Sequence, residues 1–324
     1  MELRRFEEAE TAYTEALEIR KKLAKKNPDA YNPDVAMTEN NLGNLYRNLG
    51  RFREAETAYI EALEIRKKLA QKNPDTYNPE VAQTQNNLGI IYKDLGRFEE
   101  AEHTYTEALE IRKKLAEKYP DAYNPDVAQT QNNLGNIYSD AGRFEEAEHT
   151  YTEALRIFRE LAEKNPEAYN PYVGVLKDNL GTFYQDLGRF EEAEHAHNEA
   201  LKILKKLAEK NPDAYNPGVA NTLINFGVLY VKTNRLVQAE NEFRKALDIY
   251  NPLFEKYPEA YRKRLAELWY YYSCLESLKD NKEKSIKHLK KAIELDNKYI
   301  NEAETEEEFK NIRNLREFKE LIGD

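Results

Sequence analysis

The sequence predicts an all-α fold, a right-handed superhelical α-solenoid of stacked antiparallel helix pairs. Its residues recur with a period of 46, and each period contains two stretches whose apolar residues have helical spacing. Short turns join these stretches, so consecutive helices must run antiparallel. No pair can bury both of its faces alone, and neighbouring pairs therefore stack. The period is clearest in the tyrosines Tyr31, Tyr77, Tyr123, Tyr169, Tyr215 and Tyr261.

The first helix of a pair is predicted to run from about Asn32 to Leu49. Asn32 can cap it, Pro33 fits the first helical position, and Asp34 meets the positive end of the helix dipole. Gly50 supplies the stop. At about 100° per residue the apolar residues form one stripe, which contains Val35, Leu42, Leu45, Tyr46 and Leu49.

The second helix is predicted to run from about Phe52 to Lys72 and to be long and amphipathic. Asn73-Pro74 ends it, because a residue before proline disfavours helix, and residues 75–79 are expected to bridge to the next pair. Its apolar side contains Phe52, Ala55, Tyr59, Ala62, Leu63 and Leu69.

The repeats predict four parts of the chain. Residues 1–30 are expected to be an orphan second helix of a truncated first repeat plus a connector, and residues 31–258 to be five long repeat units. Residues 259–300 form a divergent sixth helix pair, and residues 301–324 hold a C-terminal capping helix. An orphan helix would show apolar surface that a preceding helix normally covers, here Leu3, Phe6, Ala9, Tyr13 and Leu17.

The C-terminal residues 305–322 are predicted to form one amphipathic helix that closes the solenoid. Thr305 can cap this helix, and Glu308 completes a capping box. Its apolar face would consist of Phe309, Ile312, Leu315 and Phe318.

The composition argues against several classes of partner. The chain has 49 Lys+Arg against 59 Asp+Glu, a net charge of −10 that repels nucleic acid and anionic lipid surfaces. Its Lys- and Arg-rich segments are interleaved with Glu at helical spacing, which predicts solvated faces. A long apolar run and the apolar centre of a signal peptide are both absent from the sequence. The single cysteine, Cys274, is predicted to be a small buried hydrophobe. We therefore expect a cytoplasmic protein with no membrane or nucleic-acid partner.

The repeat unit resembles a known family. The spacings Leu42-Gly43-x2-Tyr46 and Ala55-x3-Tyr59-x2-Ala62 are similar to the tetratricopeptide repeat in all but length, since the usual period is about 34. The extra residues lengthen the second helix and add the Asn-Pro connector, so the variant looks most like the long-helix repeats of kinesin light chains. The resemblance implies a scaffold that binds proteins or peptides.

The pattern gives no reason to expect an enzyme, a metal site or a cofactor. Catalytic groups must converge on one point, whereas the acidic pairs, such as Glu99-Glu100, recur along the repeats at the start of second helices. His103, His149 and His195 occupy one position in three successive units, and stacked helices lie about 8–10 Å apart, too far to share a metal ion.

The polar stripe of the first helix is predicted to line a concave peptide groove. One position is asparagine in all five units: Asn41, Asn87, Asn133, Asn179 and Asn225. An amide offers donors and an acceptor, so a row of amides can bind the backbone of an extended peptide whatever its side chains. Further candidates on this face are Asn40, Asn44, Asn86, Asn132, Asn136, Arg47 and Lys93.

The amide row resembles the asparagine ladder by which kinesin light chains hold cargo peptides. Variable neighbours, including Arg47, Lys93, Asp178, Ile224 and Val228, would then set specificity. The family's chaperone-tail clamp fits poorly, because Asn40, Asn86, Asn132 and Asp178 stand where cations would be needed.

Three other interpretations stay open. The repeated asparagines could record recent duplication and local helix packing. The chain could self-assemble into a homo-oligomer through its uncovered N-terminal helix. It could also be the sensor or scaffold part of a larger signalling protein.

Overall fold

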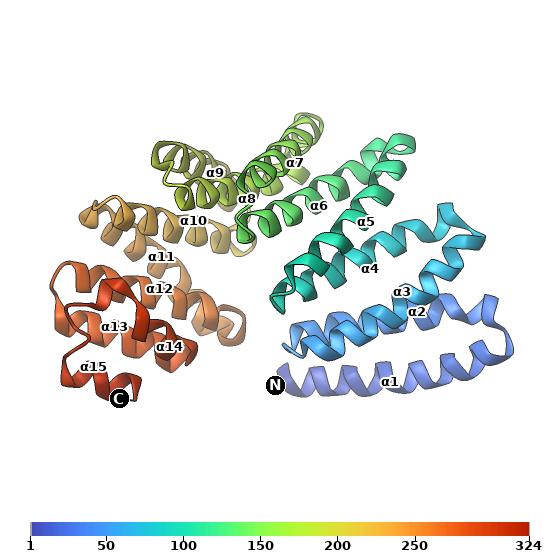
Figure 1. Cartoon of the computed structure of the whole chain (residues 1–324), viewed down its shortest axis with the longest axis horizontal. Helices are drawn as coiled ribbons and strands as arrows, with labels where there is room; N and C mark the ends of the chain where they lie inside the picture. The colour runs from blue at the N-terminus through green and yellow to red at the C-terminus, as the bar shows by residue number, and fades with distance from the viewer. Residues whose placement is uncertain (1, 324) are drawn as a thin grey trace. The chain divides into compact units, whose positions relative to one another are not determined.

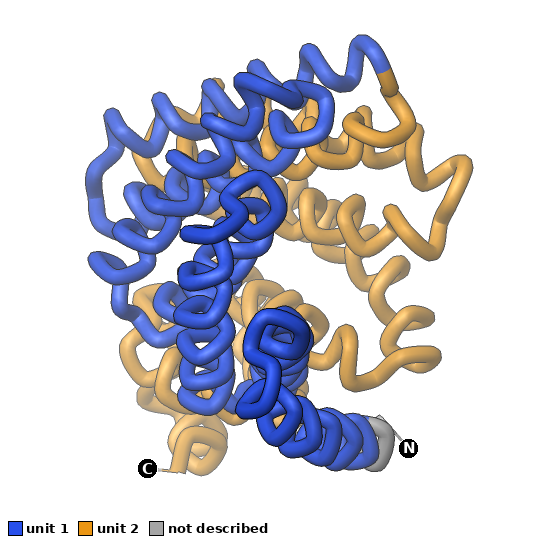
Figure 2. Tube along the Cα trace, turned by 90° about the vertical axis from the view of Figure 1, so that its right-hand side faces the viewer, with its two compact units in different colours: residues 1–164 blue, residues 165–324 orange. Residues whose placement is uncertain are grey.

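The computed structural model describes residues 2–323, with side chains from Phe6 onward. Figure 1 shows helices packed in sequence order, and the described residues contain no strand. The chain divides into two compact units, Met1–Lys164 and Asn165–Asp324 (Figure 2). The predicted class, an all-α solenoid of antiparallel helix pairs, is confirmed. Among residues 2–323 no helix is both long and apolar enough to cross a bilayer.

The helices of the first unit begin with one helix that lacks a partner before it and continue as three pairs. Their bounds are α1 (Glu2–Lys26), α2 (Pro28–Asn48), α3 (Phe52–Lys72), α4 (Pro74–Asp94), α5 (Phe98–Lys118), α6 (Pro120–Asp140) and α7 (Phe144–Lys164).

The second unit continues the same alternation and then departs from it near the C-terminus. Its elements are α8 (Pro166–Asp186), α9 (Phe190–Lys210), α10 (Pro212–Lys232), α11 (Leu236–Lys256), α12 (Pro258–Leu278), α13 (Lys282–Leu295), α14 (Lys298–Thr305), the 3-10 turn η1 (Glu307–Phe309) and α15 (Arg316–Ile322).

The first helix of each pair starts earlier than predicted. Pro28 rather than Pro33 occupies the first position of α2, and the Asn27 side chain accepts a hydrogen bond from the Ala30 backbone N–H at 3.4 Å. The expected connector is therefore helical. Two Asn-Pro pairs compete for the start, and the earlier one wins because Pro33 near the exposed N-terminal end removes only one helical hydrogen bond. Two helices of 21 residues with very short connections account for the period.

The second helix of each pair, and the turn before it, match the prediction. Helix α3 has the predicted bounds Phe52–Lys72. Gly50 has a φ of 71°, the left-handed conformation that ends α2, and Asn234 and Asp280 take its place with similar φ later in the array. The two helices of the pair approach closely at the glycine that recurs in the first helix, since a Cβ on Gly43 would lie 2.6 Å from the Tyr59 ring.

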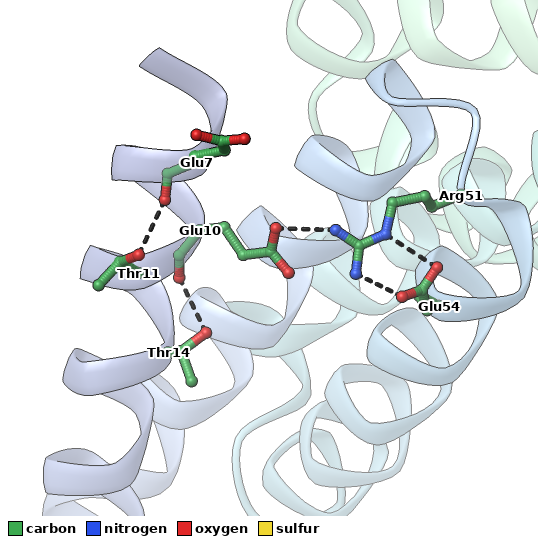
Figure 3. Close-up of polar contacts among 6 residues, drawn as sticks. All are labelled: Glu7, Glu10, Thr11, Thr14, Arg51 and Glu54. Atoms are coloured by element: carbon green, nitrogen blue, oxygen red, sulfur yellow. Dashed lines mark hydrogen bonds and ion pairs between the residues drawn. The ribbon is translucent and has the colours of Figure 1, made fainter. Parts of the chain in front are cut away.

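An arginine after the first helix of a pair, at every repeat but the last, links one second helix to the next. Arg51 donates to Glu10 of α1 at 2.7 Å and to Glu54 of α3 at 2.9 Å (Figure 3), and its guanidinium lies 4.5 Å from the centre of the Tyr46 ring. The same arrangement recurs with Arg97 and with Arg143. Because the arginine contacts both flanking helices, it sets their spacing at the surface.

The apolar face of α1 was predicted to be uncovered, but the structure covers most of it. Phe6, Ala9, Tyr13 and Leu17 are half-buried and pack against a core that includes Leu42, Leu45 and Ala58 of α2 and α3. Leu3 lies outside the described side chains. The reason is packing, because α2 and α3 cover most of the apolar residues that a preceding helix was expected to cover.

The C-terminal segment corrects a second prediction. Thr305 ends α14, and the predicted helix over residues 305–322 is divided into η1, a set of turns and the short α15. Its apolar residues Phe309, Ile312 and Phe318 are fully buried, as predicted, in a core with α12 and α13. Asn311 donates to the Ser277 carbonyl at 2.8 Å, so hydrogen bonds to the end of α12 replace helical ones.

Candidate peptide-binding surface

The first helices of successive pairs contact one another within each unit. Helix α2 contacts α4 in the first unit, while α8 contacts α10 and α10 contacts α12 in the second. The predicted amide row belongs to these helices. The surface that they share is therefore the candidate site.

Two members of the amide row bridge neighbouring first helices. Asn133 of α6 donates from Nδ2 to Asn86 Oδ1 of α4 at 3.1 Å, and Asn225 of α10 donates to Asp178 Oδ2 of α8 at 3.0 Å. Asn133 and Asn225 are half-buried. Each bridge uses the amide NH2 group, so the amide oxygen remains as an acceptor.

The other members of the row differ in exposure. Asn41 and Asn179 are half-buried, whereas Asn87 is 6% exposed and accepts a hydrogen bond from Gln83 Nε2 at 3.1 Å. Some amides of the row therefore serve packing between helices, whereas others remain partly accessible to a ligand.

The neighbouring position contributes mainly to packing in the first unit. Asn40 and Asn86, assigned by the sequence pattern to the groove, are buried. Asn40 Oδ1 accepts from Arg66 at 3.3 Å, and Asn86 Oδ1 accepts from Arg112 at 3.5 Å as well as from Asn133. Asn132 at the same position is half-buried. Asn40 and Asn86 are occupied because a buried guanidinium needs acceptors.

These buried arginines correct the prediction that the Lys- and Arg-rich segments form solvated faces. Arg112 also donates to Thr130 Oγ1 at 2.5 Å and to the Asp126 carbonyl at 3.1 Å, and Arg66 makes the equivalent bonds to Thr84 and Glu80. Burial lowers the pKa of Arg66 and Arg112. Each arginine side chain extends from a second helix toward the next pair. The charge pattern alone could not tell this buried position from a solvent-exposed one.

The remaining predicted residues are half-buried on the first helices. Asn44 and Asn136 accept hydrogen bonds from Tyr59 and Tyr151, at 2.8 Å and 2.6 Å. Lys93 lies 3.6 Å from the Asp140 carboxylate, and Arg47 is half-buried. Asn44 and Asn136 therefore orient buried tyrosines, and Arg47 and Lys93 supply positive charge in the first unit.

Asp178 replaces asparagine in the second unit and has a different partner. Its Oδ1 lies 2.8 Å from Nδ1 of His197, which is fully buried where earlier repeats have tyrosine, while its Oδ2 accepts from Asn225. The Asn-to-Asp and Tyr-to-His changes thus occur together at one contact.

A hollow of about 380 Å³ lies on the first-helix side of the second unit. Helix α8 contributes Gln185 and Asp186, and α10 contributes the row residue Asn225 together with Lys232. The hollow also borders the segment after α14. Its lining further includes Thr182, Val228, Val231, Phe243, Tyr271, Cys274, Glu306 and Glu308.

Glu306 and Glu308 were missed by the sequence reasoning, which placed Glu308 in a helix cap. A hydrogen bond that the protonated Glu308 carboxyl group donates to the Glu306 carboxylate, together with burial, raises the pKa of Glu308 to about 7. Glu306 Oε2 accepts from the Tyr270 hydroxyl at 2.8 Å. No local motif marks this pair, because the fold of the segment after α14 brings it to the first helices.

The histidine positions do not converge. The side chains of His103 and His195 are about three-quarters exposed and lie beside Glu107 and Glu199. Within the described part of the chain, no group of three or more His, Cys, Asp or Glu side chains is placed to hold a metal ion. Cys274 is buried in α12, as predicted, and burial raises the pKa of its thiol.

Comparison with protein families identifies the class of repeat. The family model described as tetratricopeptide repeat matches residues 1–68, 34–114, 113–160 and 172–251, and a second model of the same description matches residues 266–299. The chain belongs to the tetratricopeptide repeat family. Proteins of this family bind protein partners and are typically non-enzymatic scaffolds. No curated protein shows a significant match to the chain.

Solved structures share the fold. BtubC (BKLC) from P. vanneervenii is 26% identical, with a TM-score of 0.60 over 76% of this chain and 92% of that chain. The apo form of RapI is 15% identical, with a TM-score of 0.57 over 82% of this chain and 84% of that chain. A chain of the APC/C hetero-tetramer Cut9-Hcn1 is 15% identical, with a TM-score of 0.57 over 95% of this chain and 46% of that chain. The last two support the fold alone.

Proposed function

We propose that this protein is a non-enzymatic interaction scaffold that holds an extended peptide segment along its first helices. The observation that carries the proposal is the hollow on the first-helix side of the second unit, where the row residue Asn225 lines the wall. Its volume of about 380 Å³ falls within the range of about 300–1,000 Å³ that ligand pockets have.

The amides are suited to the N–H groups of a peptide. Asn133 and Asn225 use their NH2 groups in bridges between repeats, which leaves their Oδ1 atoms to accept. Asn41 is half-buried, and its side-chain amide makes no hydrogen bond within the described part of the chain. A peptide backbone with N–H groups along its length complements such a series of acceptors.

A selection followed by substitution tests this proposal. Phage-displayed random dodecapeptides are selected on the intact chain, and the affinity of an enriched peptide is measured by fluorescence anisotropy. Asn41→Ala combined with Asn133→Ala and Asn225→Ala should weaken binding about 100-fold, since each hydrogen bond contributes about 1 kcal/mol.

The matched control is Asn198→Ala, which changes an exposed asparagine of α9 on a second helix. This variant should bind like the wild type. Circular dichroism of all variants separates lost binding from lost structure. Unchanged affinity in the folded triple variant would show that the amide row does not hold the peptide.

A further inference from the structure

We propose that the hollow of the second unit is a pocket for one basic side chain, lysine or arginine, of the bound peptide. This inference rests on the proposed function and adds a chemical preference to it. The first argument is the composition of the wall. The described lining of the hollow has three acidic residues, Asp186, Glu306 and Glu308, and one basic residue, Lys232.

The positive charge of Lys232 is already engaged. Its Nζ lies 3.0 Å from Asp186 Oδ1. Glu306 and Glu308 therefore face the hollow without a lysine or arginine of the lining to neutralise them. A basic side chain from a ligand would supply that charge, and hydrogen bonds between ionised partners are about twice as strong as neutral ones.

An independent observation points to a donor in the same place. Gln185 lines the hollow and is only 6% exposed, yet its Oε1 atom is buried without a hydrogen-bond partner in the described structure. A buried amide oxygen without a donor is costly and calls for one. The ammonium group of lysine offers three donors and the guanidinium group of arginine five, and neither offers an acceptor.

The apolar part of the wall fits the stem of such a side chain. Val228 and Val231 of α10 lie beside the rings of Phe243 and Tyr271, which stack with 12° between their planes. Long basic side chains bury their methylene groups against such surfaces while the charged end reaches polar groups. A short side chain would not cover the apolar part of the wall, and an acidic one would offer no positive charge to its carboxyl groups.

Several charged groups surround the carboxyl pair, and they come from different elements. Helix α12 contributes Tyr270, which donates to Glu306, and α14 contributes Glu302. Burial opposes ionisation of Glu306, but hydrogen bonds from Glu308 and Tyr270, and last the charge of Arg313 in the following turns, lower its pKa. Glu307 adds a smaller contribution to the raised pKa of Glu308. Below a pH of about 7 the pair holds a proton on Glu308. A bound basic group would displace it.

The test compares two selections and one matched pair of peptides. Random dodecapeptides are selected in parallel on the intact wild-type chain and on the variant with Glu306→Gln and Glu308→Gln. We expect lysine or arginine at one position of the wild-type binders and no such enrichment on the variant. Replacing that residue by its neutral analogue, citrulline or norleucine, should weaken binding to the wild type about 10- to 100-fold and leave binding to the variant nearly unchanged.

Glu307→Gln is the control, because Glu307 lies between the two carboxyl residues in sequence but is exposed and pairs with Lys310. It should keep the preference for a basic residue. If the double variant does not fold, the citrulline or norleucine peptide on the wild-type chain still decides the question. Binders without a basic residue, or with an acidic one, would overturn the pocket while leaving the amide row intact. A selection that yields no binder at all would overturn the proposed function and the pocket together.

Discussion

Gly227→Ala should destabilise the second unit although alanine is the better helix former. Gly227 lies in α10, and a Cβ placed on it would lie 2.8 Å from Phe243 Cζ and closer still to two other ring atoms. Ordinary carbon contacts are about 3.5–4.0 Å. The ring is fully buried between Tyr271 and Tyr272, so it has little room to move.

The magnitude follows from two opposing effects. Overpacking of a well-filled core costs about 1–3 kcal/mol, and the severe overlap places this site near the upper end. The higher helix propensity of alanine stabilises a helix interior by about 1 kcal/mol relative to glycine. We therefore expect a net loss of about 1–2 kcal/mol in the free energy of unfolding.

Gly218→Ala provides a control in the same helix. A Cβ there would lie 3.4 Å from Leu204 Cδ2, an ordinary contact with a flexible side chain. This variant should gain up to about 1 kcal/mol. The two substitutions should therefore change the free energy of unfolding in opposite directions, although both gain the same helix propensity.

Urea unfolding followed by circular dichroism and by Trp269 fluorescence measures both variants. Trp269 packs against the same core as Phe243, and it is the single tryptophan of the chain. Adding Phe243→Leu should relieve the loss in Gly227→Ala, since the next pair already combines Ser273 with Leu289 at these positions. Equal effects of the Gly227 and Gly218 substitutions, with no relief from Phe243→Leu, would refute the reasoning.

Three further predictions concern charged groups. Arg112→Leu should lower the free energy of unfolding by about 2 kcal/mol, because the buried Thr130 hydroxyl oxygen and the Asp126 carbonyl lose their guanidinium donor, while Lys113→Leu on the exposed side should change it by less than about 0.5 kcal/mol. Urea unfolding compares the two variants. Burial first, and the neighbouring Glu61 carboxyl group second, raise the pKa of Glu39 to about 7, so its contribution is favourable at low pH and is lost as the pH rises from about 4.5 through 7. Glu39→Gln should therefore remove a decline of about 1–2 kcal/mol between pH 5 and pH 8, after allowance for solvent screening, and an unchanged decline would contradict this. A dodecapeptide carrying the basic residue should bind more tightly at pH 8 than at pH 6, because Glu308, with a pKa of about 7, gains its charge over that interval; anisotropy titrations should show no such rise in Glu308→Gln.

The repeat period predicted the fold class and the second helices well. Phe52–Lys72 is marked by a strong amphipathic pattern and ended by Asn73-Pro74, so a single signal defined each end. The start of the first helix was ambiguous, because Asn27-Pro28 and Asn32-Pro33 carry the same capping chemistry. Local preference could not decide between them.

The candidate site could be predicted only in part. The amide row was recognisable as a repeated residue on the first helix, but whether a given amide is buried depends on the second helix that packs on it, as Arg112 shows for Asn86. The acidic pair was out of reach of any pattern. Glu306 and Glu308 lie in a segment that the sequence suggested was helical, and the burial of Phe309 and Ile312 brings them to the hollow.

The arginine that links successive second helices makes the array modular. Arg143 meets Glu102 as Arg97 meets Glu56, and the geometry is nearly the same, with N–O distances of 2.6 and 2.8 Å. Excision of residues 74–119 would remove one whole module and bring Arg143 to Glu56, with an Asn-Pro junction preserved at the cut. Arrays built in this way can change length by duplication or deletion without new junction chemistry, so the reach of the surface can evolve separately from the contacts that stabilise it.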